Sequence, residues 1–145
     1  MAIEIEGATP LFAVYDLPTS LAFYRDLLGF QVVHHSQAFT DAKDDYGWAL
    51  LRMNSVELML NNAYENNIRP PLPDAARNAW HKDVCLYMGC RDVEGAYAYL
   101  RSRGVDAKEP KVAYYGMKQL YLKDPDGYSL CFQRNATDVE MAARN

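Results

Sequence analysis

Apolar and polar residues alternate along several short stretches of the chain, a pattern typical of strands with one buried face. The stretch from Leu120 to Gln133 predicts two such strands joined by a sharp turn, because Pro125 presets φ and Gly127 tolerates a positive φ. One face of this hairpin is apolar and carries Leu120, Leu122, Leu130 and Phe132. The other face is more polar and carries Gln119, Tyr121, Cys131 and Gln133. We expect the apolar face to pack against helices and the polar face to meet water or a ligand.

The predicted elements occur twice in the same order. A strand at residues 9–16 leads into a helix that starts near Pro18 and ends at Gly29, and a strand at residues 83–92 leads into a helix that ends at Gly104. An aspartate precedes each helix and further strands follow it, including a short one expected at residues 105–110. The pattern therefore predicts an α+β protein in which a strand–helix–strand–strand–strand unit is present twice.

We expect one domain over residues 1–145, with the first module at 8–61 and the second at 83–134. Residues 62–82 contain three prolines and several asparagines, a composition that predicts a linker loop. Residues 135–145 are expected to form a C-terminal tail.

Composition and charge argue against several classes of protein. The formal net charge is −4 with no basic run, which disfavours nucleic acid or an anionic membrane surface as a partner. No apolar stretch could span a bilayer and the first residues lack a signal pattern, so we expect a cytoplasmic protein. Cys85, Cys90 and Cys131 lack the paired spacing of a zinc site, and their odd number argues against a disulfide framework.

Three stretches resemble a known superfamily. YDLPTSLAFYRDLLGF (residues 15–30), RDVEGAYAYLRSRGV (91–105) and LYLKDPDGYSLCF (120–132) are similar to parts of the two halves of vicinal oxygen chelate proteins. This superfamily includes glyoxalase I, extradiol dioxygenases, and the fosfomycin- and bleomycin-resistance proteins, and the likeness covers residues 9–133. It implies two βαβββ modules whose mixed sheets curl around a cup, with the helices on the outside.

The resemblance also locates the positions from which metal-using members bind a divalent ion, usually through His, Glu or Gln. Here they fall at Thr9, Cys85, Cys131 and Met59, with Glu57 one inward step before Met59. Magnesium, manganese and iron prefer carboxylate, imidazole and water, and structural zinc sites need four good nitrogen or sulfur ligands. Thr and Met do not supply these ligands, so we expect no metal ion and no other cofactor.

The inner face of the cup is predicted to bind the ligand. The expected ligand-binding residues are Trp48, Leu50, Arg52, Glu57 and Met59 from the first module, and Tyr87, Gln119, Tyr121 and Cys131 from the second. Mostly apolar walls with a few polar groups are typical of ligand sites. Glu57 is the only carboxylate in this set, and so it is the candidate general base.

Simpler interpretations of the same residues stay open. The two-residue turn at Asn54 and Ser55 places Arg52 opposite Glu57, so these residues are equally consistent with a cross-strand ion pair. If that pair is buried, removing one partner costs on the order of a few kcal/mol. Trp48 and Tyr121 are equally consistent with side chains that only fill space between the sheets.

The leading hypothesis is a metal-free protein, similar to bleomycin-resistance proteins, that sequesters a small aromatic or amphipathic molecule. The alternative is a glyoxalase- or dioxygenase-type enzyme with a displaced metal site or with Glu57 as general base. A third possibility is an accessory domain that assembles with a protein partner. We also expect a homodimer with Trp80, Tyr114 and Tyr115 at the contact, because exposed sheet edges invite pairing and interfaces favour aromatic residues. Tyr114 and Tyr115 are equally consistent with a loop that closes over the cup.

Overall fold

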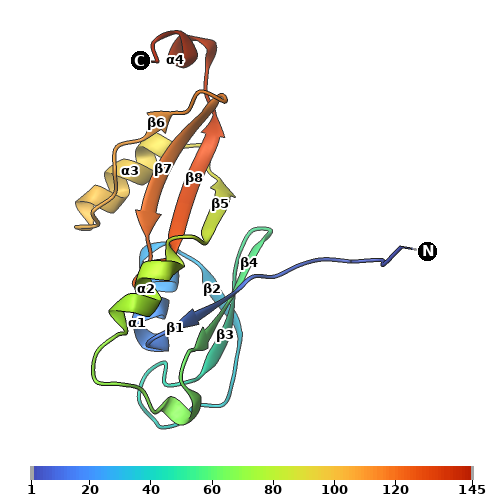
Figure 1. Cartoon of the computed structure of the whole chain (residues 1–145), viewed down its shortest axis with the longest axis vertical. Coiled ribbons are helices and arrows are strands. Elements are labelled where there is room, and N and C mark those ends of the chain that lie inside the picture. Colours follow the sequence, from blue (N-terminus) through green and yellow to red (C-terminus); the bar gives the residue numbers. More distant parts are fainter. Residues whose placement is uncertain (1, 145) are drawn as a thin grey trace. The chain divides into compact units, whose positions relative to one another are not determined.

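The computed structural model describes residues 2–144. The chain forms two compact units, with the boundary between Asp74 and Ala75. Each unit contains one four-stranded mixed sheet with helices (Figure 1). Within residues 2–144, no helix is both long and apolar enough to cross a membrane.

The first unit is a βαβββ module. Its elements are β1 (Leu11–Val14), α1 (Leu17–Leu21), the π-helix η1 (Ala22–Leu27), β2 (Gln31–His35), β3 (Trp48–Met53), β4 (Val56–Asn62) and the 3-10 helix η2 (Glu65–Asn67). The strand order is β1-β4-β3-β2, with β1 parallel to β4 and the remaining pairs antiparallel.

The second unit repeats this topology. Its elements are α2 (Ala75–His81), β5 (Cys85–Gly89), α3 (Val93–Ser102), β6 (Lys111–Val112), β7 (Met117–Lys123), β8 (Ser129–Asn135) and α4 (Asp138–Ala142). The order is β5-β8-β7-β6, with β5 parallel to β8. The predicted α+β fold with two βαβββ modules is therefore confirmed.

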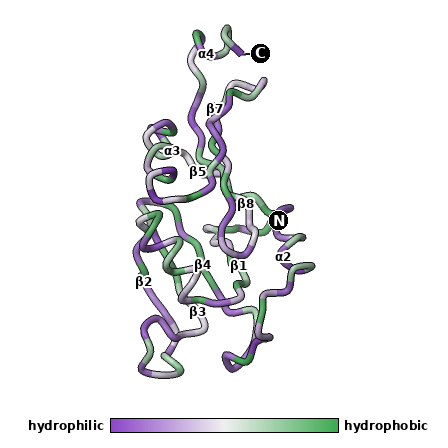
Figure 2. The backbone as a smooth tube through the Cα atoms, turned by 90° about the vertical axis from the view of Figure 1, so that its left-hand side faces the viewer, coloured by the Kyte–Doolittle hydropathy of each residue, from purple (hydrophilic) through white to green (hydrophobic). Residues whose placement is uncertain are grey.

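In both sheets, the alternation of side chains separates a buried face from a more accessible one. Hydrophilic and hydrophobic residues succeed one another along the backbone (Figure 2). In the first unit the fully buried residues include Leu17, Leu21 and Tyr24 of the helical segment and Leu51, Leu58 and Leu60 of the sheet. In the second unit they include Leu100, Leu120 and Leu130. One face of each sheet thus forms the core, and the opposite face is left for other contacts.

The first helix begins as predicted and then changes its hydrogen bonding. Asp16 caps α1 by accepting a hydrogen bond from the Thr19 backbone N–H at 3.1 Å. From Ala22 the segment is a π-helix, in which the Leu28 N–H donates to the Phe23 carbonyl at 3.0 Å. Gly29, with a φ of 95°, lets the chain leave the helix where a side chain would be strained.

Three stretches differ from their predicted structure. Residues 105–110 form no strand; the stretch ends at Pro110, which has no N–H to donate to a ladder, and β6 begins after it at Lys111. The expected tail contains α4, which begins with a capping box between Thr137 and Glu140. The expected linker contains η2 and α2, and the latter is rich in alanine, a strong helix former.

The stretch that leads up to Pro70 is fastened to the first unit. The Tyr15 hydroxyl donates to the Pro70 carbonyl at 2.6 Å, and Arg69 forms an ion pair with Asp16 at 2.8 Å. The Asn67 amide donates to Asp45 at 3.1 Å. This part of the expected linker therefore belongs structurally to the first module.

Helix α2 is fastened to the second unit through the predicted turn at residues 124–127. The His81 Nδ1–H donates to the Asp126 carbonyl at 2.7 Å, and the His81 ring stacks on Tyr128 with the ring centroids 4.0 Å apart. A Cβ atom at Gly127 would lie 2.8 Å from the Asn78 carbonyl oxygen. The close approach of α2 to the turn is therefore possible only because residue 127 is a glycine.

This contact predicts unequal costs for two glycine substitutions. Gly127 and Gly104 both have positive φ, 86° and 78°, but a Cβ atom at Gly104 meets nothing within 4 Å. Gly104→Ala should cost about 1–2 kcal/mol for the left-handed backbone alone. Gly127→Ala should cost at least about 1 kcal/mol more, because α2 must also move. Urea unfolding followed by circular dichroism measures both, and equal costs would show that α2 does not pack on the turn.

Candidate functional site

The accessible face of the second sheet carries a hydrogen-bonded group of tyrosines and glutamines, which we call the tyrosine face. Its members are Tyr87, Tyr115, Gln119, Tyr121 and Gln133. Strand register sets their positions, because Tyr87 on β5 and Tyr121 on β7 both pair with Cys131 on β8. Gln119 on β7 pairs with Gln133 on the antiparallel strand β8.

Gln119 is the centre of this group. Its Oε1 accepts from the Tyr115 hydroxyl at 2.8 Å and from the Tyr121 hydroxyl at 3.3 Å, and its Nε2 donates to the Gln133 Oε1 at 2.9 Å. The Tyr87 and Tyr121 hydroxyls lie 3.4 Å apart, and their rings meet edge to face at 83°. Gln119 is buried, whereas Tyr87 is 52% and Tyr121 38% exposed. The buried amide therefore positions rings that a ligand can reach.

Burial and hydrogen bonding favour the neutral forms of Tyr121 and of the thiols of Cys85 and Cys131. The hydrogen bond with Tyr87, together with burial, raises the pKa of Tyr121 above its ordinary value. Burial raises the pKa of the Cys131 thiol to about 11 and also raises the pKa of Cys85. The Tyr121 phenol therefore remains a hydrogen-bond donor, and the two thiols remain protonated.

The accessible face of the first sheet has the predicted register. Arg52 pairs with Glu57 and Leu50 with Met59 across β3 and β4, while Trp48 pairs with Asn61. The Arg52 Nε and Nη2 atoms donate to the Glu57 Oε1 at 3.2 and 3.1 Å. The two side chains are 47% and 35% exposed, so the pair contributes no more than about 1 kcal/mol. Removing one partner should therefore not cost the few kcal/mol that were expected for a buried pair.

The positions at which the resemblance predicts metal ligands carry side chains that do not suit a hard divalent ion. Thr9 precedes β1, Met59 lies on β4, Cys85 on β5 and Cys131 on β8. Two cysteines could serve zinc, but Thr9 and Met59 do not complete the set of four good nitrogen or sulfur ligands that a structural zinc site needs. Among residues 2–144, no three or more His, Cys, Asp or Glu side chains lie together in a group that could hold a metal ion.

Two members of the tyrosine face were not among the expected ligand-binding residues. Gln133 lies on the polar side of the predicted hairpin, so the alternation already indicated its orientation. Tyr115 was expected either in a loop that closes over the cup or at a contact between chains. It is brought back to Gln119 by the turn in which the Gly116 N–H donates to the Ala113 carbonyl at 3.0 Å, and no periodic pattern marks that turn. Whether the expected residues contact a ligand stays a prediction.

A cavity of about 530 Å³ opens beside Tyr121 in the second unit. We call it the lysine cavity, and its lining residues are Val105, Asp106, Lys108, Tyr121, Leu122, Lys123 and Ser129. Its volume lies within the range of about 300–1,000 Å³ that is usual for small-molecule sites.

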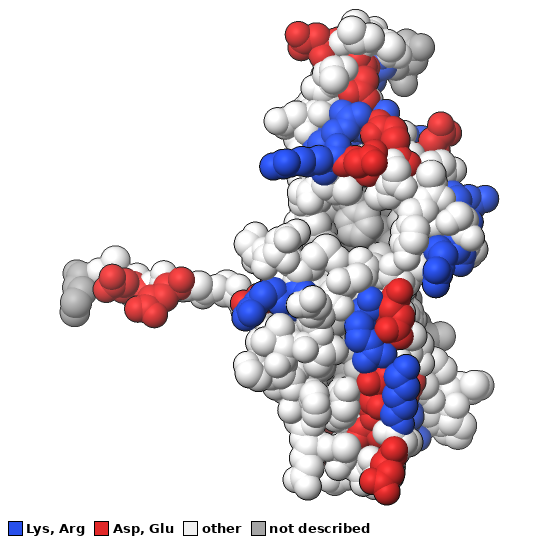
Figure 3. Space-filling view, turned by 180° about the vertical axis from the view of Figure 1, so that it is seen from behind, with Lys and Arg blue, Asp and Glu red and all other residues white. Residues whose placement is uncertain are grey.

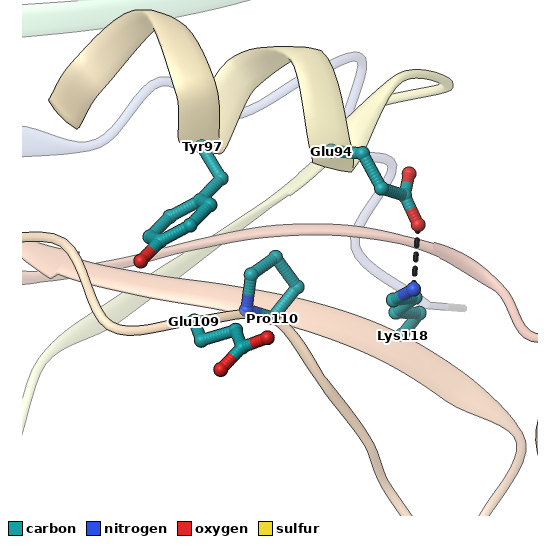
Figure 4. Close-up of a pocket in the computed structure, with 5 residues that line it drawn as sticks. All are labelled: Glu94, Tyr97, Glu109, Pro110 and Lys118. Atoms are coloured by element: carbon teal, nitrogen blue, oxygen red, sulfur yellow. Dashed lines mark ion pairs between the residues drawn. The ribbon is translucent and has the colours of Figure 1, made fainter. Parts of the chain in front are cut away.

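A smaller hollow of about 130 Å³ lies between α3 and β7, lined by Glu94, Tyr97, Glu109, Pro110 and Lys118 (Figure 4). Its lysine is fully engaged, because Lys118 forms ion pairs with Glu94 at 2.6 Å and with Glu140 at 2.9 Å. Arg134 bridges the same two carboxylates at 2.6 and 2.8 Å. On the face shown in Figure 3, basic and acidic side chains likewise lie next to one another. We regard this four-residue network as structural, since it ties α4 to β7, β8 and α3.

Comparison with known proteins gives a family and a set of similar folds. The model of the Glyoxalase/Bleomycin resistance protein/Dioxygenase superfamily matches residues 8–132. Among solved structures, TnmS3, an antibiotic binding protein from Streptomyces sp. CB03234, is 19% identical with a TM-score of 0.67, covering 93% of this chain and 100% of that one. A glyoxalase/bleomycin resistance protein from the same organism is 22% identical with a TM-score of 0.59, covering 87% and 97%.

A bleomycin-binding protein complexed with bleomycin is 24% identical with a TM-score of 0.59, covering 90% of this chain and 99% of that one. At these identities the solved structures show a shared fold and nothing finer. No curated protein matches the sequence.

The charge network predicts how stability depends on pH. The hydrogen bond from Lys118 lowers the pKa of Glu94 from its ordinary 4.5 to about 2, and Arg134 lowers the pKa of Glu140. A carboxylate whose pKa is lower in the folded state than in the unfolded state stabilises the folded protein at pH values above its unfolded-state pKa. This contribution is lost as the pH falls through its folded-state pKa. At pH 6 the wild type should therefore melt at a higher temperature than Glu94→Gln, and its free energy of unfolding should be larger by up to about 1 kcal/mol. The difference should vanish near pH 2.

Glu109→Gln is the matched control, because Glu109 lines the same hollow but forms no ion pair with any of the residues 2–144. Its melting temperature should stay close to that of the wild type at both pH values. A constant difference between wild type and Glu94→Gln over this range would contradict the ion-pair explanation.

Proposed function

Because the chain belongs to the glyoxalase/bleomycin resistance protein/dioxygenase superfamily, we propose that it binds and sequesters a small aromatic or amphipathic molecule without a metal ion. The observation that carries this proposal is the tyrosine face. It combines reachable aromatic rings, phenol and amide hydrogen-bond groups, and no charged side chain. Such a surface can hold a planar ligand by stacking and fix its orientation by hydrogen bonds.

The geometry of Tyr87 and Tyr121 supports a role in binding. Their edge-to-face arrangement presents two differently oriented rings to one ligand. Because Gln119 and Tyr87 hold the Tyr121 hydroxyl, little rotational freedom is lost when a ligand binds, and preorganisation of this kind favours affinity. The names of TnmS3 and the bleomycin-binding protein, which describe antibiotic binding, support a small-molecule ligand in this fold.

The enzymatic alternative has less support. Glu57 would be the general base, but Arg52 donates two hydrogen bonds to its Oε1, and a cross-strand ion pair accounts for both residues. A displaced metal site lacks a suitable donor group among residues 2–144.

We further propose that the protein is a cytoplasmic homodimer. β1 and β5 are edge strands of their sheets, and exposed edges favour pairing. Trp80 and Tyr114 are largely exposed, and interfaces are enriched in such residues.

Ligand binding is tested with a panel of aromatic and amphipathic compounds that includes bleomycin and 2-naphthamide. A compound that shifts the melting temperature is then titrated calorimetrically into wild type and Tyr121→Ala. Loss of one stacked ring should weaken binding about three- to ten-fold. Tyr99→Ala is the control, since Tyr99 is an exposed tyrosine on α3 outside the tyrosine face. A panel without any saturable binder would contradict the proposed function.

Native mass spectrometry combined with elemental analysis tests the metal-free state and the homodimer together. We expect a mass of two 16.5 kDa chains with no stoichiometric metal. About one first-row metal per chain that disappears in Cys85→Ser and Cys131→Ser variants would overturn the metal-free proposal. A mass of one chain at micromolar concentration would overturn the homodimer.

A further inference from the structure

The lysine cavity combines an apolar wall with two lysines. Tyr121 lines this cavity and is also a member of the tyrosine face, so the two sites are adjacent. Val105 and the largely buried Leu122 add apolar surface to the lining, and Lys108 and Lys123 add positive charge. Ser129 adds a hydroxyl that donates to the Lys82 carbonyl at 3.3 Å, which leaves its oxygen able to accept a hydrogen bond.

The charges of the cavity do not balance. Within residues 2–144, the ammonium groups of Lys108 and Lys123 form no ion pair, whereas Lys118 in the smaller hollow has two carboxylate partners. Asp106 is the only carboxylate of the lining. Its side chain is fully exposed and faces the Arg101 guanidinium at 3.6 Å. A positive charge of two lysines is therefore left over on a chain whose net charge is −4.

We propose that the sequestered molecule carries an anionic group, such as a carboxylate, which lies between Lys108 and Lys123 while its aromatic part lies against Tyr121. This inference depends on the proposed binding function and specifies the class of its ligand. The apolar wall alone would accept neutral and charged aromatics alike. The two lysines make the site prefer an acid, because an anion gains Coulomb energy with both ammonium groups.

The preference is tested with two probes of nearly equal shape, 2-naphthoate and its neutral analogue 2-naphthamide, titrated into the full-length protein. Wild type should bind 2-naphthoate at least about five-fold more tightly, and added salt should reduce this advantage because the lysines are exposed. Lys108→Gln and Lys123→Gln should each weaken 2-naphthoate binding by up to about five-fold and leave 2-naphthamide binding unchanged.

Lys111→Gln is the control for net charge. It removes the same charge from the same module, at an exposed position of β6 that does not line the cavity. It should change the affinity for neither probe.

The two proposals fail in different ways. Equal binding of the two probes, or equal losses in the control and in the two cavity variants, would overturn the preference for an acid while binding itself stands. If neither probe binds but other compounds of the aromatic panel do, the acid preference is again overturned, since 2-naphthoate should fit. If no compound of any kind binds, the proposed function itself is overturned.

Discussion

The pairing of one strand with a parallel neighbour on one side and an antiparallel neighbour on the other sets the geometry of each module. In the second module this strand is β8, which holds β5 and β7 in register. Because side chains alternate across a strand, this register sends Leu120 and Leu130 into the core and leaves Tyr87 and Tyr121 accessible. A slip by a single residue would exchange the two faces and bury the tyrosines in place of the leucines. The core and the candidate site are therefore fixed by the same hydrogen bonds.

Much of this architecture could be predicted from the sequence because it depends on local periodicity. The alternation around the turn at residues 124–127 predicted which side of the hairpin is buried, and the Asn54–Ser55 turn predicted that Arg52 lies opposite Glu57. The change to a π-helix after Leu21 leaves no mark in the pattern of apolar residues, because it alters hydrogen bonding within a helix that remains amphipathic.

The site was less predictable, since it depends on exposure and on contacts between residues that no period relates. Register alone could not tell whether the Arg52–Glu57 pair is buried, and that distinction separates a strong contribution to stability from a weak one. Tyr115 reaches Gln119 through the geometry of a turn, and the lysine cavity forms where an irregular segment passes the end of β7. By contrast, the capping box at Thr137 is a recognisable sequence signal for α4.

The contacts that hold Pro70 to the first module and His81 to the second limit how far the two modules can separate. A linker of residues 62–82 would act as a long tether, but most of it is bound to one module or the other. Only residues 71–74 remain between the Pro70 contact and the start of α2. Four residues span at most about 14 Å when extended. An exchange of modules between two chains would therefore have to occur over a short reach, or after α2 or the Pro70 contact had been released.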